Sequence, residues 1–153
     1  PPRAAAIDRS ELEGLRLALH EPHRVGSRLD PLLFDDALVR GAYELLASTP
    51  DARAALDAAD PPTRELLERV AVEEPFLGDD ADDAVPSVVV QLAEQAGRRR
   101  LEALVRAGDD RASELKQRLD DVVTARSTRS WADADRAAQR LVAWGAVPTE
   151  EQS

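Results

Sequence analysis

The sequence predicts an all-α fold in which an N-terminal helical bundle is joined by a long helix to a C-terminal helical hairpin. Apolar residues recur three and four positions apart along most of the chain, and no stretch alternates with a period of two. Single prolines and glycines interrupt this pattern and divide it into separate helices. A chain of 153 residues is also long enough to bury a hydrophobic core without disulfide bonds.

The first helix is predicted over residues 8–20. Asp8 and Glu11 have the spacing of a capping box, in which both side chains bond to backbone N–H groups at the start of a helix. Pro22 is expected to end this helix, and a short turn or loop then leads to Phe34. One face of the helix carries Leu12, Leu15 and Leu19.

Three more helices are predicted in the first half of the chain. Asp35 can cap a helix over residues 36–48, and a short Ala-rich helix follows over residues 51–59. Asp60 and the two prolines after it start a third helix, which ends before Pro75. The inward faces of the first and third of these helices carry Leu38, Ala42, Leu45, Leu46, Leu66, Leu67 and Val70.

The longest helix is predicted over residues 84–107, and its apolar stripe changes sides near Gly97. A helix of this kind buries its first half against one partner and its second half against another, so we expect it to link two packed units. The run Arg98-Arg99-Arg100 at the crossover is interpreted as solvated, because three successive helical residues point in different directions. The first face carries Val85, Val88, Val89, Leu92 and Ala96, and the opposite face carries Gly97, Leu101, Leu104 and Val105.

Two final helices are predicted to form the hairpin, over residues 111–125 and 131–144. Gly108-Asp109-Asp110 turns the chain into the first of them, and Ser130 starts the second. Gly145 and Pro148 end it. The inward residues of the hairpin are Leu115, Leu119, Val122 and Val123 on the first helix, and Trp131, Ala134, Ala138, Leu141 and Val142 on the second.

These elements divide the chain into four parts. Residues 8–96 form the bundle, and residues 97–148 form the end of the connecting helix and the hairpin. Residues 1–7 are expected to be a disordered or vector-derived start, and residues 149–153 a frayed tail. The start without a Met makes the chain look like a piece of a longer protein.

The composition argues against several classes of protein. The formal net charge is −10, and the excess negative charge lies in residues 1–83, so tight binding to nucleic acid is not expected. The chain has no Cys, which excludes disulfides and thiolate sites and fits a reducing compartment. No apolar run approaches the roughly 20 residues that cross a bilayer, and no signal peptide opens the chain. We therefore expect a cytoplasmic protein that does not bind membranes.

No motif for catalysis or for a cofactor stands out. The segment His20-Glu21-Pro22-His23 lacks the i, i+4 spacing of a helical metal site, so both histidines are interpreted as surface residues at a helix end. The acidic run at residues 78–83 lacks the Gly and the Glu that a calcium loop requires and is interpreted as a solvated linker. The glycines are scattered, and no phosphate-binding motif is present. We therefore expect a non-catalytic fragment that holds no cofactor and no metal.

A candidate protein-binding face lies on the last helix. Trp144 falls off the inward stripe of that helix, on the side that carries Arg136 and Arg140. Trp and Arg are the residue types enriched in interface hot spots. A Trp144 ring folded back on its own hairpin is the alternative interpretation. The candidate partner-binding residues are Arg118, Arg136, Arg140, Leu141 and Trp144.

Two segments near the start of the chain carry a resemblance to a known family. Residues 11–22 form a leucine-rich helix that begins with an acidic residue and ends at a proline. Residues 32–46 hold a Phe followed by a helix with an R-x-x-[FY] signature, here Arg40 and Tyr43. Together with residues 88–106 and the hairpin, they resemble the C-terminal domain of bacterial DnaG-type primases over nearly the whole chain.

The resemblance implies a helical bundle and a terminal hairpin by which primase attaches to the N-terminal domain of the replicative DnaB-type helicase, coupling primer synthesis to unwinding. The parent chain would then be a primer-synthesising enzyme, and the tail of a single-stranded-DNA-binding protein is a second partner to test. Three alternatives stay open: the N-terminal domain of a replicative helicase, an unrelated helical adaptor, and an acidic chaperone-like module. The hairpin argues against the first, since a linker and an ATPase core would follow at that point in a helicase.

Overall fold

The computed structural model describes residues 8–25, 28–73, 81–128 and 131–145, and these residues form helices and their connections without any strand. The all-α prediction is therefore confirmed. The elements are α1 (Arg9–His20), α2 (Pro22–Val25), the 3₁₀ helix η2 (Pro31–Leu33), α3 (Ala37–Ser48), α4 (Ala52–Ala58), α5 (Pro61–Val72), α6 (Ala81–Arg106), α7 (Ala112–Ser127) and α8 (Trp131–Gly145).

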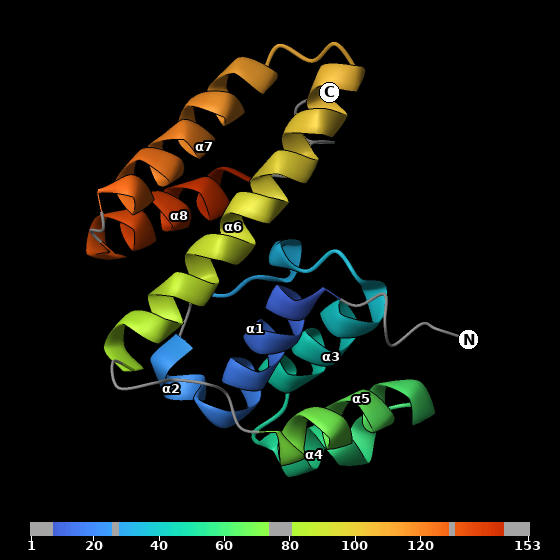
Figure 1. Ribbon diagram of the computed structural model, residues 1–153. Helices are drawn as coiled ribbons and strands as arrows, with labels where there is room; N and C mark the ends of the chain where they lie inside the picture. Colours follow the sequence, from blue (N-terminus) through green and yellow to red (C-terminus); the bar gives the residue numbers. More distant parts are fainter. Residues whose placement is uncertain (1–7, 26–27, 74–80, 129–130, 146–153) are drawn as a thin grey trace.

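Helix α6 runs between two groups of helices (Figure 1). Helices α1 to α5 lie together on one side of it, and α7 and α8 form a hairpin on the other. This is the predicted order of bundle, long helix and hairpin. In addition, η2 contacts both α6 and α8, so the bundle meets the hairpin directly as well as through α6.

Aspartates determine where several helices begin. Asp36 accepts hydrogen bonds from the backbone N–H groups of Leu38 and Val39, so it caps α3 in place of the predicted Asp35. Pro22 follows the end of α1 as expected, but it also begins α2, because proline fits the first position of a helix. The aspartates that cap α-helices in this way are Asp8, Asp36, Asp51 and Asp60.

Helix α1 is central to the bundle and contacts α3, α5 and α6. Because it is covered on several sides, Leu17 is buried although it lies off the predicted stripe, and Leu19 is only partly buried. The Phe34 ring stacks on Tyr43 with the ring centroids 5.0 Å apart, and the Tyr43 hydroxyl donates to the Leu29 carbonyl at 3.0 Å. These contacts hold the segment around η2 against the bundle.

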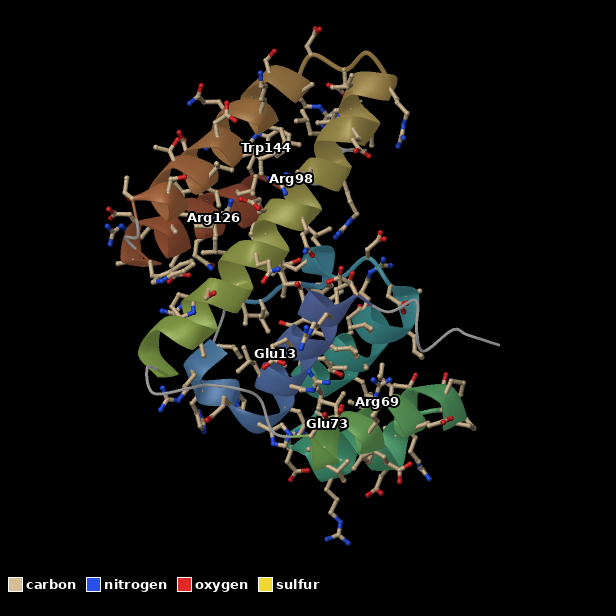
Figure 2. All side chains as sticks on the ribbon, viewed as in Figure 1. Glu13, Arg69, Glu73, Arg98, Arg126 and Trp144 are labelled. Atoms are coloured by element: carbon tan, nitrogen blue, oxygen red, sulfur yellow. The ribbon has the colours of Figure 1, made fainter. Side chains whose placement is uncertain are left out.

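Ion pairs join α1 to the end of α5 (Figure 2). Arg16 lies 2.8 Å from Glu13 on its own helix and 3.0 Å from Glu73, which follows α5. Glu73 also lies 3.7 Å from Arg69. Arg16 thus brings together two helices that are far apart in the sequence, and part of the excess acidic charge of the bundle is paired at this end.

The middle of α6 is buried on more than one side because the bundle and the hairpin both cover it. The change of face is found at Gly97, where a Cβ would lie 3.1 Å from side-chain atoms of both Leu119 and Leu141 of the hairpin. The prediction was wrong for Val105, which is 62% exposed, since Leu104 fills the inward position of that last turn. The fully buried residues of the middle are Val89, Val90, Leu92 and Ala93.

The turn from α6 to α7 contains a glycine with a positive φ, as the C-terminal ends of helices commonly do. Gly108 has a φ of 65°, and the N–H of Asp109 bonds to the Leu104 carbonyl at 2.9 Å, as in a Schellman motif. The Asp109 carboxylate then accepts hydrogen bonds from the backbone N–H and from the guanidinium of Arg111. The hairpin core that this turn positions consists of Leu115, Leu119, Val122, Ala134, Ala137, Ala138 and Leu141.

Several predictions fall on parts of the chain that the structure does not describe. The start at residues 1–7, the tail at 149–153 and the cap at Ser130 lie outside the described residues. The acidic run at residues 78–83 lies partly outside them, and α6 begins at Ala81, within that run.

Candidate interaction surface

Three of the predicted binding residues lie along one face of α8, and Arg118 lies on α7. Arg136, Arg140 and Trp144 are spaced four residues apart, so they follow one another along the same face of α8. Arg136 is exposed and pairs with Asp133 one turn earlier. Arg140 is exposed as well, and it forms no ion pair with the carboxylates of the described residues. This face therefore presents a positive charge in a chain whose net charge is −10.

Trp144 lies partly buried where α8 meets α7. Its side chain packs against the core and borders a hollow between the helices. Glu114 of α7 accepts hydrogen bonds from Arg118, at 2.9 Å, and from Trp144, and these bonds lower the pKa of its carboxyl. Glu114 thus brings Arg118 and Trp144 together. Most of the Trp144 contacts are those expected for a ring that folds back on its own hairpin.

Leu141 is placed differently from the other predicted residues. It is 4% exposed, and a Cβ at Gly97 would touch its methyl groups. It therefore packs inside the hairpin and does not belong to the exposed face of α8.

An apolar hollow of about 100 Å³ opens where η2, α6, α7 and α8 meet. Leu32 of η2 stands beside it and is 51% exposed, whereas its neighbour Leu33 is buried. Among the described residues that form the wall, Arg100 is the charged one. The lining residues are Leu32, Leu33, Ala93, Ala96, Gly97, Arg100, Leu115, Leu141, Val142 and Trp144.

A second, more open hollow of about 220 Å³ also borders Leu32. Arg99 lies 3.5 Å from Asp35 there and donates to the Leu33 carbonyl at 3.4 Å. Arg40 donates to the carbonyls of Phe34 and Asp35, both at 3.0 Å. The hollow is lined by Pro31, Leu32, Phe34, Asp35, Arg40 and Arg99.

The run Arg98-Arg99-Arg100 is only partly the solvated crossover that the sequence predicted. Arg98 is exposed and lies 3.3 Å from Glu94, on the side of the hairpin. Arg99 reaches the segment around η2, and Arg100 lines the apolar hollow. The three guanidinium groups therefore lie in three different environments, because successive residues point in different directions around the helix axis.

Sequence reasoning missed the polar contacts that hold the hairpin in place. Glu94 of α6 is buried, and Arg126 of α7 donates to its carboxylate at 3.0 Å. Arg28, just before η2, lies 3.0 Å from Asp135 of α8. A carboxylate within an otherwise apolar stripe of α6 was the available signal for the first contact; nothing in the sequence points to the second, which joins residues more than a hundred positions apart.

The His, Asp and Glu side chains of the described residues do not gather into a metal site. No group of three or more His, Asp or Glu side chains is placed to hold a metal ion among them. His20, predicted to be a surface residue, is partly buried, and its Nε2 lies 3.0 Å from the Val70 carbonyl, where it links α1 to α5. None of the helices in the described ranges combines the length and the hydropathy needed to cross a bilayer.

Comparisons with the profiles of known protein families, with curated protein sequences and with solved structures find no match to this chain.

Proposed function

We propose that this chain is the helicase-binding C-terminal domain of a bacterial DnaG-type primase. The sequence pattern of residues 11–22 and 32–46 supports the proposal, and so does the arrangement of the helices. A bundle, a long connecting helix and a terminal hairpin, in that order, are what the resemblance implies for such a domain. The partner would be the N-terminal domain of the replicative helicase.

The role of the domain would be attachment and not chemistry. A hairpin that packs on α6 along both of its helices is a rigid element, and rigid helix faces bind partners with little loss of conformational entropy. The exposed face of α8, with Arg140 and the accessible part of Trp144, supplies one cation and one aromatic ring for such contacts. By holding primase at the helicase, the domain would keep primer synthesis close to newly unwound DNA.

The hairpin also favours this proposal over the helicase N-terminal domain itself. In this chain α7 and α8 pack closely on α6 and share its core, so they are an integral part of the fold. A helicase N-terminal domain would be followed at that point by a linker and an ATPase core. An unrelated helical adaptor remains the second candidate.

Calorimetric titration into the N-terminal domain of the replicative helicase from the same organism tests the proposal. We expect specific binding that Trp144→Ala weakens by about tenfold or more, as is typical of an interface hot spot. A thermal melt of each variant separates a contact role of Trp144 from a packing role. Arg140→Ala should also weaken binding, whereas Arg53→Ala, a change at another exposed arginine, on α4, serves as the matched control. Absence of binding by the unmodified chain would overturn the proposal.

A further inference from the structure

Leu32 and the two hollows beside it form a continuous surface, which we call the Leu32 face. Leu32 lines both hollows, one apolar and one flanked by arginines. The face lies where η2 meets α6 and α8, so bundle and hairpin both contribute to it. It adjoins the exposed stripe of α8 at Trp144, which lines the apolar hollow.

The turn that presents Leu32 is firmly held. The Asp30 carboxylate accepts a hydrogen bond from the Leu32 N–H at 2.9 Å, and Pro31 fixes the backbone at the start of η2. Leu33, the next residue, is 1% exposed and anchors η2 in the core. Leu32 therefore projects outward from a rigid support, and half of its apolar surface stays in contact with water, where it gains nothing for folding.

The apolar hollow has the size of one aliphatic side chain. Dry apolar cavities of roughly 150 Å³ hold a benzene-sized group. A hollow of about 100 Å³ walled by Leu, Ala and Val side chains and Trp144 therefore suits a smaller apolar group. A partner side chain that entered it would also cover Leu32.

The charge of the Leu32 face is opposite to that of the whole chain. Among the described residues, Arg40, Arg99 and Arg100 line the two hollows together with one carboxylate, Asp35. The Arg99–Asp35 pair is loose, at 3.5 Å, and Asp35 is 67% exposed, so Arg99 can exchange it for another carboxylate at little cost. The chain as a whole carries −10, so a local excess of arginine complements an acidic partner.

We propose that the Leu32 face binds an acidic segment of the helicase N-terminal domain, with one aliphatic side chain in the apolar hollow and a carboxylate on Arg99. This inference rests on the proposed function and extends it. The binding surface would then cross the junction of bundle and hairpin instead of being confined to the hairpin. The partner would also recognise the relative position of the two units.

Titration of the helicase N-terminal domain with two matched pairs of variants tests this. Leu32→Asp places a charge at the rim of the hollow and should weaken binding by about tenfold or more. Val105→Asp makes the same change at another exposed apolar site, on the last turn of α6, and should leave affinity unchanged. Arg99→Gln should weaken binding at low salt and reduce its salt dependence. Arg98→Gln, the neighbouring change on the hairpin side, should do neither.

A photocrosslinking experiment tests the same inference in case Leu32→Asp does not fold. Because the chain has no Cys, Leu32→Cys creates a single labelling site for a photoreactive maleimide. Crosslinking to an acidic peptide of the helicase domain is expected from this site, and none from Val105→Cys. Equal affinities of the Leu32 and Val105 variants, or equal crosslinking, would overturn the inference and leave the proposed function standing. If the unmodified chain does not bind the helicase domain, this inference and the proposed function are both overturned.

Discussion

Arg126, in the last turn of α7, donates a hydrogen bond at 3.0 Å to Glu94, whose side chain is 5% exposed in the middle of α6. Arg98 approaches the same carboxylate oxygen from α6 itself, at 3.3 Å. The other oxygen of Glu94 is buried and has no hydrogen-bond partner among the described residues. The Arg126 contact is thus a polar link between the long helix and the hairpin, set among apolar neighbours.

The first prediction concerns the two arginines of this link. Removing a partner from a buried carboxylate leaves its charge poorly solvated, so Arg126→Ala should lower the free energy of unfolding by about 1–3 kcal/mol. Arg98 is 57% exposed, so Arg98→Ala should cost less than about 1 kcal/mol. Urea denaturation of both variants, followed by far-ultraviolet circular dichroism, measures the difference. Equal losses would show that Arg126 acts as a surface charge only.

The second prediction contrasts two helical glycines. A Cβ at Gly14 would lie 2.7 Å from Leu92 and 3.3 Å from the Phe34 ring, whereas a Cβ at Gly41 would meet nothing within 4 Å. Gly14→Ala should therefore destabilise the fold by about 1–3 kcal/mol through overpacking between α1 and α6. Gly41→Ala should stabilise it by about 0.5–1 kcal/mol, because alanine favours the helix. Opposite shifts of the melting temperature are expected, and shifts of the same sign would contradict the packing of α1 on α6.

Much of the fold could be predicted from the sequence because its signals are local. Asp60 with the prolines after it, and Gly108 with Asp109, mark helix ends through contacts within a few residues. Burial was harder to predict. Leu17 and Val90 lie off the main stripes, and they are buried because three or more helices surround α1 and α6.

The candidate site was less predictable because it depends on contacts between distant parts of the chain. Trp144 and Arg140 could be chosen from residue type and spacing, but the bond from Trp144 to Glu114 depends on the angle between α7 and α8. Leu32 was missed because a short 3₁₀ helix leaves no periodic pattern in the sequence. Its position beside Trp144 exists only after the hairpin has folded onto α6.

The third prediction is a pH dependence at the turn between α6 and α7. The side chain and the backbone N–H of Arg111 bind Asp109 and lower the pKa of its carboxyl from 3.8 to about 2. Because the pKa is lower in the folded state, the ionised form favours folding above pH 4, and this contribution is lost as the pH falls toward 2. A carbon-13 titration of the Asp109 carboxyl should give this value. In Arg111→Ala the pKa should return toward its ordinary value; an unchanged pKa would show that Arg111 is not the cause.

The last prediction concerns Arg28 and Asp135, which join the segment before η2 to α8 at 3.0 Å. The side chain of Asp135 is 15% exposed and that of Arg28 is 41% exposed, so the pair is partly shielded from water. Because this ion pair joins the segment before η2 to α8, Arg28→Ala should raise the rate at which η2 and α8 open locally. A contribution of about 1 kcal/mol corresponds to about fivefold faster amide exchange in peptides from η2 and α8, with α5 unchanged. Hydrogen exchange read by mass spectrometry resolves these peptides.

Arg136→Ala is the matched control, because Arg136 pairs with Asp133 on the exposed side of the same helix and should leave exchange at η2 unaltered. A uniform increase in all protected peptides would mean that the pair stabilises the whole fold and that bundle and hairpin open as one unit. A local increase would instead place a hinge at η2, beside the surface that we expect the helicase to bind.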